Sequence, residues 1–382
     1  MVKPNDTPRL TLIQHGLVHA PEPKGVQSVL LAGQEIVALG TINQDALQTL
    51  GLPYSVVDAS DCVVTPGWID PHEHILGAGG EQGWNSRTAE VGVSELLRAG
   101  ITTVVGCLGT DTVTRTLPAL LAKAQQLEAD GISAYIYTGG FWVPPQTLTG
   151  SIMDDLVIID KVVGAGELAI ADTRSPEPTR DTLAQIVSQA VVGSSIAGKA
   201  GVIHFHVGSG DRRLALLNAL LDEHDIPPRH LYPTHITRSE ALMDEAIALA
   251  KRGAYVDIDV VDDNLWQCLR YYGDHGGDFA QLTVSSDAQT PGGSPTKLYR
   301  NVVAAVQEGG FTLDDVLPLV TLNPARVLKL DRKGRLAEGL DGDVLVLRQD
   351  TLEVVHVFAR GKHLVKGGQV ALESTQEQPA AS

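Results

Sequence analysis

Short apolar segments alternate with longer segments of helical periodicity through most of the chain. The apolar segments are rich in β-branched residues, which is typical of buried strands. Helical patterns fall between most of them, for example at residues 116–130, 181–190, 213–224 and 239–252. We expect barrel strands at residues 63–69, 101–107, 134–137, 168–171, 201–205, 231–234, 254–258 and 282–285. Eight strands joined by crossover helices predict an α/β fold of the (β/α)8 TIM-barrel type.

The two ends of the chain have a different pattern, with short strands separated by glycines and no long helix. The expected strands lie at residues 10–13, 28–31, 35–39 and 54–58, and again at residues 343–347, 354–359 and 363–365. Because the two ends of a domain often lie close together, these strands can pair with one another. We therefore predict a small β-sandwich domain built from residues 1–62 and 335–382, beside a barrel domain of residues 63–334.

Composition narrows the possible functions. Of the 382 residues 43% are hydrophobic, and the net charge of −17 argues against a nucleic-acid partner. There is no apolar run of about 18 residues and no apolar core of a signal peptide near the start, so we expect neither a membrane span nor export. Cys62, Cys107 and Cys268 form no CxxC pattern. They favour a reducing cytoplasm and argue against both a disulfide framework and a cysteine-ligated metal.

Two histidines, His72 and His74, follow the first expected barrel strand. In extended backbone, residues two apart point to the same face, so both imidazoles project together while Glu73 turns away. Two imidazoles at a strand end are half of a metal site, although ordinary loop histidines would give the same pattern. The pair therefore needs support from other strand ends.

Barrels of this type place their chemistry at the carboxyl ends of the strands, and three further strands end in possible ligands. These are His206 after the fifth strand, His235 after the sixth and Asp287 after the eighth. Imidazole and carboxylate ligands together suit zinc or a similar divalent ion. His204, one strand step before His206, is interpreted as a packed residue. Several acidic residues lie near the end of the seventh strand, and we interpret them as part of a solvated loop or as helix caps. They are Asp257, Asp259, Asp262 and Asp263.

The stretch around the histidine pair, with Pro66-Gly67 before it and Asp70-Pro71 within it, resembles the first-strand signature of the amidohydrolase superfamily. Members of that superfamily are metal-dependent hydrolases built on a (β/α)8 barrel. A closer resemblance, covering nearly the whole chain, is to the isoaspartyl dipeptidases. It rests on GAGGE at residues 77–81, LGTD at 108–111, AIAD at 169–172 followed by Arg174, PTH at 233–235 followed by Arg238, and SSD at 285–287.

This resemblance implies a site with two divalent cations, which we expect to be zinc. His72 and His74 would bind one cation, and His206 and His235 the other. A ligand from the fourth strand would bridge the two, and Asp287 would complete the first site. A hydroxide shared by the cations would attack the isopeptide bond of a β-aspartyl dipeptide, with Asp287 shuttling the proton to the leaving amine.

The sequence departs from that family at three positions. The family's bridging lysine, which is often carbamylated, falls on Glu167, whose carboxylate can also bridge two cations, whereas Lys161 is a weaker substitute further upstream. The family's carbonyl-binding tyrosine falls on Phe141, which has no hydroxyl. The family's serine after the last barrel strand falls near Pro291, and Ser294 is the nearest candidate. The last two changes leave the substrate open.

Four residues at the same face are expected, by the resemblance, to bind a small acidic dipeptide. Arg174 and Arg238 offer bidentate contacts to carboxylates, Glu81 suits an ammonium group, and Thr110 adds a hydroxyl. For either arginine, a surface ion pair is the alternative role. Two other functions stay open: a hydrolase of another small acidic amide, cyclic amide or N-acyl amino acid, or a catalytically silent metal-binding homologue. Because members of the family assemble, we expect a homo-oligomer.

Overall fold

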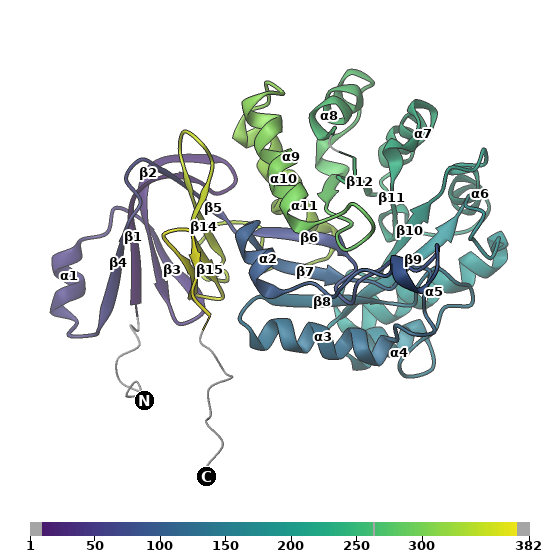
Figure 1. The fold of residues 1–382 in the computed structure, drawn as a ribbon, viewed down its shortest axis with the longest axis horizontal. Helices are drawn as coiled ribbons and strands as arrows, with labels where there is room; N and C mark the ends of the chain where they lie inside the picture. The colour runs from purple at the N-terminus through teal and green to yellow at the C-terminus, as the bar shows by residue number, and fades with distance from the viewer. Residues whose placement is uncertain (1–9, 263, 373–382) are drawn as a thin grey trace, which may run out of the picture.

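Strands from both ends of the chain form one sheet in the computed structural model, which describes residues 10–262 and 264–372 (Figure 1). The nine-stranded sheet has the order β17-β16-β15-β14-β5-β1-β2-β3, with β4 paired to β1. The predicted pairing of the two ends is present, because β14 runs antiparallel to β5. The strands are β1 (Leu10–His19), β2 (Pro23–Ala32), β3 (Glu35–Gly40), β4 (Tyr54–Asp58), β5 (Cys62–Pro66), β14 (Val344–Arg348), β15 (Val354–Ala359), β16 (Lys362–Lys366) and β17 (Gln369–Val370).

The apolar run at residues 63–69, expected as one strand, is two strands in two different sheets. β5 belongs to the nine-stranded sheet, and β6 (Trp68–Glu73) begins the parallel sheet. Gly67 lies between them, where a Cβ would come within 2.2 Å of the Thr102 hydroxyl oxygen. Both strands are buried throughout, so no charged residue interrupts the run in the sequence. The pairing thus places Cys62–Pro66 with the ends of the chain, and the division of the chain into two domains stays a prediction.

The other strands are parallel and carry the carboxyl ends that matter for function. Six of them have the order β11-β10-β9-β8-β7-β6, and β12 pairs with β13. Backbone hydrogen bonds join this pair to both edges of the six: Tyr255 N–H donates to Leu231 O at 3.2 Å, and Asp287 N–H donates to His72 O at 3.1 Å. The strands are β7 (Ile101–Gly106), β8 (Ser133–Thr138), β9 (Val162–Ile170), β10 (Val202–Val207), β11 (Leu231–Thr234), β12 (Val256–Asp259) and β13 (Leu282–Ser285). β9 begins well before residue 168, where its start was expected. The prediction missed its first residues because the small residues 164–166 hide the apolar signal.

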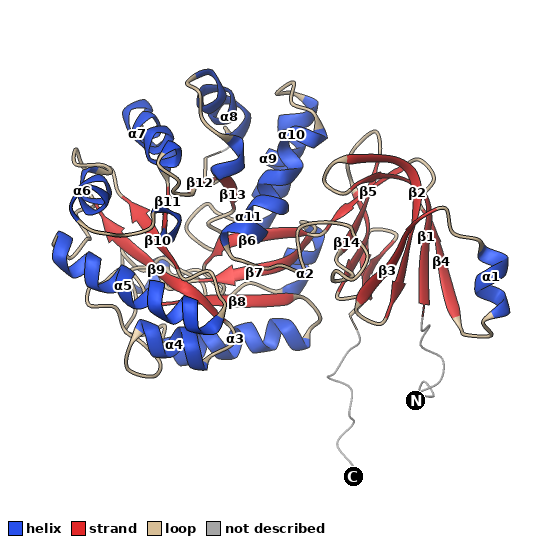
Figure 2. Ribbon diagram, turned by 180° about the vertical axis from the view of Figure 1, so that it is seen from behind, coloured by secondary structure: helices blue, strands red, loops and turns tan. Residues whose placement is uncertain are grey.

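Helices cover the outer side of the parallel strands, which gives a TIM-barrel type of fold (Figure 2). Hydroxyl side chains cap their first turns where helical patterns were expected, as Thr116, Thr179 and Ser239 do. In the described part of the chain, no helix is long and apolar enough to cross a membrane. The helices are α1 (Gln44–Thr49) beside the nine-stranded sheet, and α2 (Val93–Arg98), α3 (Leu117–Ala129), α4 (Ile152–Ile158), α5 (Arg180–Ala197), α6 (Ala215–Glu223), α7 (Glu240–Lys251), α8 (Leu265–Asp274), α9 (Pro295–Gln307), α10 (Leu313–Val320) and α11 (Leu322–Val327).

Candidate metal centre and substrate pocket

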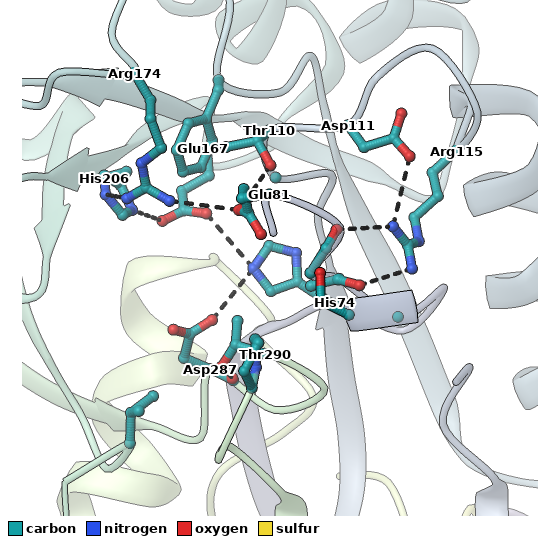
Figure 3. A pocket seen from close by; sticks show the side chains of 18 of the residues that line it. His74, Glu81, Thr110, Asp111, Arg115, Glu167, Arg174, His206, Asp287 and Thr290 are labelled. Atoms are coloured by element: carbon teal, nitrogen blue, oxygen red, sulfur yellow. Dashed lines mark hydrogen bonds and ion pairs between the residues drawn. The ribbon is translucent and has the colours of Figure 1, made fainter. Parts of the chain in front are cut away.

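The carboxyl ends of the parallel strands open into a cavity of about 500 Å³. The predicted ligand His72 is fully buried beside it. Side chains from well-separated parts of the chain meet there, as Figure 3 shows for His74, Glu167 and Asp287. The other predicted site residues all line the cavity: His74, Glu81, Thr110, Glu167, Arg174, His206, His235, Arg238 and Asp287.

One group of donors consists of His72, His74, Asp287 and Glu167. His74 Nε2 lies 3.2 Å from Asp287 Oδ1 and 3.6 Å from Glu167 Oε2. His72 Nε2 lies 3.6 Å from each of the same two oxygens. Ligands bound to one cation at about 2.1 Å stand about 3.4 Å apart in a tetrahedron. Most of these separations are too long for hydrogen bonds and suit four ligands of a single cation.

Glu167 connects this group to a second pair of histidines. Its Oε2 faces His72 and His74, whereas its Oε1 lies 2.8 Å from His206 Nδ1 and 3.1 Å from His235 Nε2. Burial alone would raise the pKa of the Glu167 carboxyl, but the neighbouring histidines hold that pKa well below its usual range. The charged carboxylate therefore turns one oxygen toward each donor group, as a bridging ligand must.

An irregularity in β9 directs Glu167 into the cavity. The pairing of β10 with β9 shifts between Ile203 and Phe205, so that β9 has an additional residue at this point. Gly166 precedes Glu167 with φ 145°, and a Cβ there would lie 2.5 Å from the carbonyl oxygen of His204. Only glycine accepts this backbone at this distance from the next strand.

A carboxylate behind each histidine of the second pair fixes its ring. Asp172 Oδ2 lies 3.0 Å from His206 Nε2, and Asp259 Oδ2 lies 2.8 Å from His235 Nδ1. In each ring the remaining nitrogen faces Glu167, which leaves it available to a cation. Burial disfavours a charged His235, but Asp259 and Glu167 outweigh this and raise its pKa to about 9.

The donor set fits divalent cations. Both ring nitrogens of His72 and Oδ1 of Asp287 are buried and make no hydrogen bond to the described residues. Buried polar atoms in proteins nearly always have a partner, and a cation would satisfy these. Three overlapping clusters have donor atoms within 4.8 Å of one another: His72-His74-Cys107-Glu167, Glu167-His206-His235 and His235-Asp259-Asp287. The sequence spacing had argued against a cysteine ligand, yet Cys107 belongs to the first cluster.

The interpretation of the acidic residues near the end of β12 as a solvated loop is wrong for two of them. Asp257 is fully buried and accepts hydrogen bonds from the hydroxyls of Thr234, Thr283 and Ser285 at 2.7, 2.6 and 2.6 Å. Asp259 holds His235. Asp262 is exposed, and Asp263 lies outside the described residues. Two of these carboxylates therefore belong to the interior because hydroxyls and an imidazole from other strands satisfy them.

We expect Asp259→Asn to lower metal affinity and turnover by about 10- to 100-fold, the usual loss when a carboxylate behind a histidine ligand is removed. Titration of the apo-protein with Zn²⁺ in competition with a chelator would measure the affinity. The matched variant is Asp257→Asn, which should lower the melting temperature more than the metal affinity. Equal metal affinity in wild type and Asp259→Asn would contradict the role given to Asp259.

The predicted substrate residues form a hydrogen-bonded wall of the cavity. Glu81 Oε1 accepts a hydrogen bond from Thr110 Oγ1 at 2.9 Å and lies 3.4 Å from Arg174 Nη1. Arg174 is fixed by two hydrogen bonds to Asp172 at 2.9 and 2.8 Å, and its guanidinium carbon lies 5.3 Å from the centre of the Phe141 ring. Arg238 is held less firmly, with Nη1 3.8 Å from Asp172 Oδ2. The wall thus presents two guanidinium groups and the Glu81 carboxylate beside the donor clusters.

A profile of the amidohydrolase family matches residues 63–364. The chain belongs to the amidohydrolase family. A solved structure of the beta-aspartyl dipeptidase from Fervidobacterium islandicum AW-1 is 39% identical to this amidohydrolase, with a TM-score of 0.91 over 96% of this chain and 100% of that one. A structure of that dipeptidase in complex with a beta-Asp-Leu dipeptide is 38% identical over the same shares, with a TM-score of 0.90.

The names of more distant relatives of this amidohydrolase indicate other substrates. A dihydroorotase from Clostridium acetobutylicum is 23% identical over 89% of this chain and 90% of its own length. The adenine deaminase 1 from Carboxydothermus hydrogenoformans is 22% identical over 86% of this chain, which spans only 54% of that protein.

Three residues of this amidohydrolase that the sequence left undecided lie outside the cavity. Lys161, at the amino end of β9, contacts Glu128 and donates to the Ala134 carbonyl at 3.1 Å. Ser294 caps the first turn of α9. His204 packs behind His72 with the ring centres 4.5 Å apart.

Arg115 and Asp172 are two residues of the site to which the sequence analysis assigned no role. The buried guanidinium of Arg115 donates to the carbonyls of Leu76, Ala78 and Thr88 at 3.1, 2.7 and 3.3 Å. It therefore holds the glycine-rich loop that leads to Glu81. No sequence spacing reveals this contact, because the loop and Arg115 meet only in the fold. Asp172 had a signal, since it stands two residues before Arg174 just after β9.

Proposed function

We propose that this chain is a two-cation amidohydrolase that hydrolyses the isopeptide bond of small β-aspartyl dipeptides. The observation that carries the proposal is the position of Glu167, whose two oxygens face two donor groups beside a charged wall. Similarity to a beta-aspartyl dipeptidase over nearly the whole chain supports the substrate class. In this proposal the parallel strands form a closed (β/α)8 barrel, the chain ends form a β-sandwich, and the protein is a cytoplasmic homo-oligomer.

The imidazole and carboxylate donors suit Zn²⁺. His72, His74 and Asp287 would hold one ion. His206 and His235 would hold the other, with Glu167 between the two. Bound there, the ions would supply a water that ionises near neutral pH and a Lewis acid for the amide carbonyl.

Asp287 is the residue placed to move the proton. Its Oδ1 faces His72 and His74, and its side chain borders the cavity. A carboxylate in that position can accept the proton of the attacking water and pass it to the leaving amine. This proton transfer would distinguish Asp287 from a residue that acts only as a metal ligand.

The charged wall complements the groups of a β-aspartyl dipeptide, which carries two carboxylates and one ammonium. Arg174 and Arg238 offer planar forks to the carboxylates. Glu81 offers a carboxylate to the ammonium, with Thr110 holding it in place. Phe141 contributes no hydroxyl: its ring is packed 4.5 Å from that of His206 and supports Arg174. Stabilisation of the oxyanion would then fall more heavily on the cation.

We expect Arg238→Lys to lower kcat/KM by about 10- to 150-fold, because lysine keeps the charge and loses the fork, and a charged hydrogen bond left unmade costs about 1.5–3 kcal/mol. The loss should shrink for a dipeptide whose matching carboxylate is amidated. The matched control is Arg212→Lys, an exposed arginine that pairs with Glu177. Equal losses for free-acid and amidated substrates would mean that Arg238 supports the fold instead of reading the ligand.

A substrate panel with the zinc-loaded protein tests the proposal as a whole. β-Aspartyl dipeptides should be turned over faster than α-aspartyl and γ-glutamyl dipeptides of the same second residue. Dihydroorotate belongs in the panel because dihydroorotases are among the curated relatives. Preferential opening of the cyclic amide would replace the substrate class, and metal binding without turnover of any amide would favour a silent homologue.

A further inference from the structure

We propose that the thiolate of Cys107 is an additional ligand of the cation held by His72 and His74. This inference rests on the two-cation site of the proposed function and adds a donor to it. Cys107 follows β7 directly, and its backbone N–H donates to the carbonyl of Glu73 at 3.0 Å. Because Glu73 lies between the two histidines on the neighbouring strand, the thiol stands at the same rim as their imidazoles.

The distances fit a shared cation. Cys107 Sγ lies 3.6 Å from His74 Nδ1 and 4.0 Å from His74 Nε2. A donor atom from each of His72, His74, Cys107 and Glu167 lies within 4.8 Å of the others. With bonds of about 2.3 Å to sulfur and about 2.1 Å to nitrogen, a sulfur and a nitrogen ligand of one tetrahedral zinc ion stand about 3.6 Å apart. Small side-chain shifts would therefore bring all four donors to one ion.

The surroundings of the thiol also point to a ligand. Cys107 is 1% exposed, and the carbonyl of Glu73 lies 3.7 Å from its Sγ. A second observation concerns His72, which is fully buried in the same cluster: neither of its ring nitrogens makes a hydrogen bond of acceptable geometry within the described chain. A buried thiol that only packs would be a weak donor to the Glu73 carbonyl and would leave those nitrogens unexplained.

A thiolate at this position would change the character of the first cation. Soft sulfur ligands favour Zn²⁺ and Co²⁺ over Mn²⁺ and Mg²⁺. Its negative charge would make that cation a weaker Lewis acid, which leaves the polarisation of the carbonyl to the cation at His206 and His235. Asp287 Oδ1 lies 3.6 and 3.2 Å from Nε2 of His72 and His74, so the thiolate would join Asp287 at this cation as a fifth donor.

Cobalt substitution of the whole chain tests this directly, because thiolate-bound Co²⁺ has a charge-transfer band in the near ultraviolet. The wild type loaded with two Co²⁺ per chain should show the band. Cys107→Ser should lose it while the visible bands of bound cobalt remain, and should release Zn²⁺ to a chelator at least about tenfold more readily. The matched controls are Cys62→Ser and Cys268→Ser, which remove buried cysteines of β5 and α8 and should keep the band.

Two results would overturn the proposal that the thiolate is a ligand: a wild type that holds two Co²⁺ per chain without the band, or a band that persists in Cys107→Ser. If Cys107→Ser does not fold, the spectrum of the wild type together with the two control variants still decides. Failure of the proposed function has a different appearance. A chain that binds two Co²⁺ with the band but turns over no amide keeps the thiolate and loses the activity, whereas a chain that binds no cobalt overturns both.

Discussion

Asp287→Asn should lower kcat on the best dipeptide substrate by about 10²- to 10⁴-fold, the range that a positioned proton-transfer group contributes. The amide oxygen can still approach a cation beside His72 and His74, which lie 3.6 and 3.2 Å from the present carboxylate oxygen. It cannot accept and release a proton. Steady-state kinetics with metal analysis of the same sample would separate the two roles, since we expect at least one cation to remain bound.

The matched control for this variant is Asp262→Asn, an exposed acidic residue in the loop after β12. It removes the same charge from the same end of the strands and should leave kcat unchanged. Near-native turnover by Asp287→Asn would show that Asp287 is only a ligand. If Asp287→Asn loses both cations as well as turnover, a role of Asp287 in holding the metal site together would be enough to explain the result.

Glu167→Gln should lose at least one of the two cations and lower turnover at least about 100-fold. Substitution of a residue that only supports a metal ligand costs up to about 100-fold, and Glu167 is itself a proposed ligand. The substitution keeps the shape of the side chain but removes its charge and replaces one oxygen with a donor. One of the histidine pairs would then face an amide N–H instead of a carboxylate oxygen. Metal content per chain, measured after dialysis, would report the change.

The same assignment predicts that wild-type apo-protein regains activity with Zn²⁺ equally well with and without bicarbonate. A glutamate bridge needs no CO₂, whereas a carbamylated lysine must be formed from it. Lys161→Ala serves as the control, because Lys161 contacts Glu128 away from the cavity. Strong dependence on bicarbonate that disappears in Lys161→Ala would overturn the bridging role of Glu167.

Periodicity predicted most of the parallel strands because each is a short buried run between amphipathic helices. β11 and β13 lie where residues 231–234 and 282–285 were expected. The pattern failed at residues 63–69, since the run is buried in two sheets and has no charged residue at the change from one to the other. Which strand pairs with which is decided by contacts far apart in the sequence, and periodicity does not record those.

The candidate site shows the same division. His72, His74, His206, His235 and Asp287 could be predicted because each follows a strand of a fold that places such ends together. Asp259 and Asp262 belong to one acidic run, yet only Asp259 turns to an imidazole from the neighbouring strand. Cys107 and Arg115 were missed for the same physical reason, as their partners come from other strands and loops.

The pairing of β5 with β14 has a consequence for how the protein is made. Pro66 pairs with Val344, so one edge of the strand that leads directly into the histidine-bearing β6 stays unpaired until β14 has left the ribosome. Until then β5, paired on its other side with β1, is an apolar edge strand, a surface that invites aggregation. A chain stopped before β14 would present that edge to chaperones or proteases.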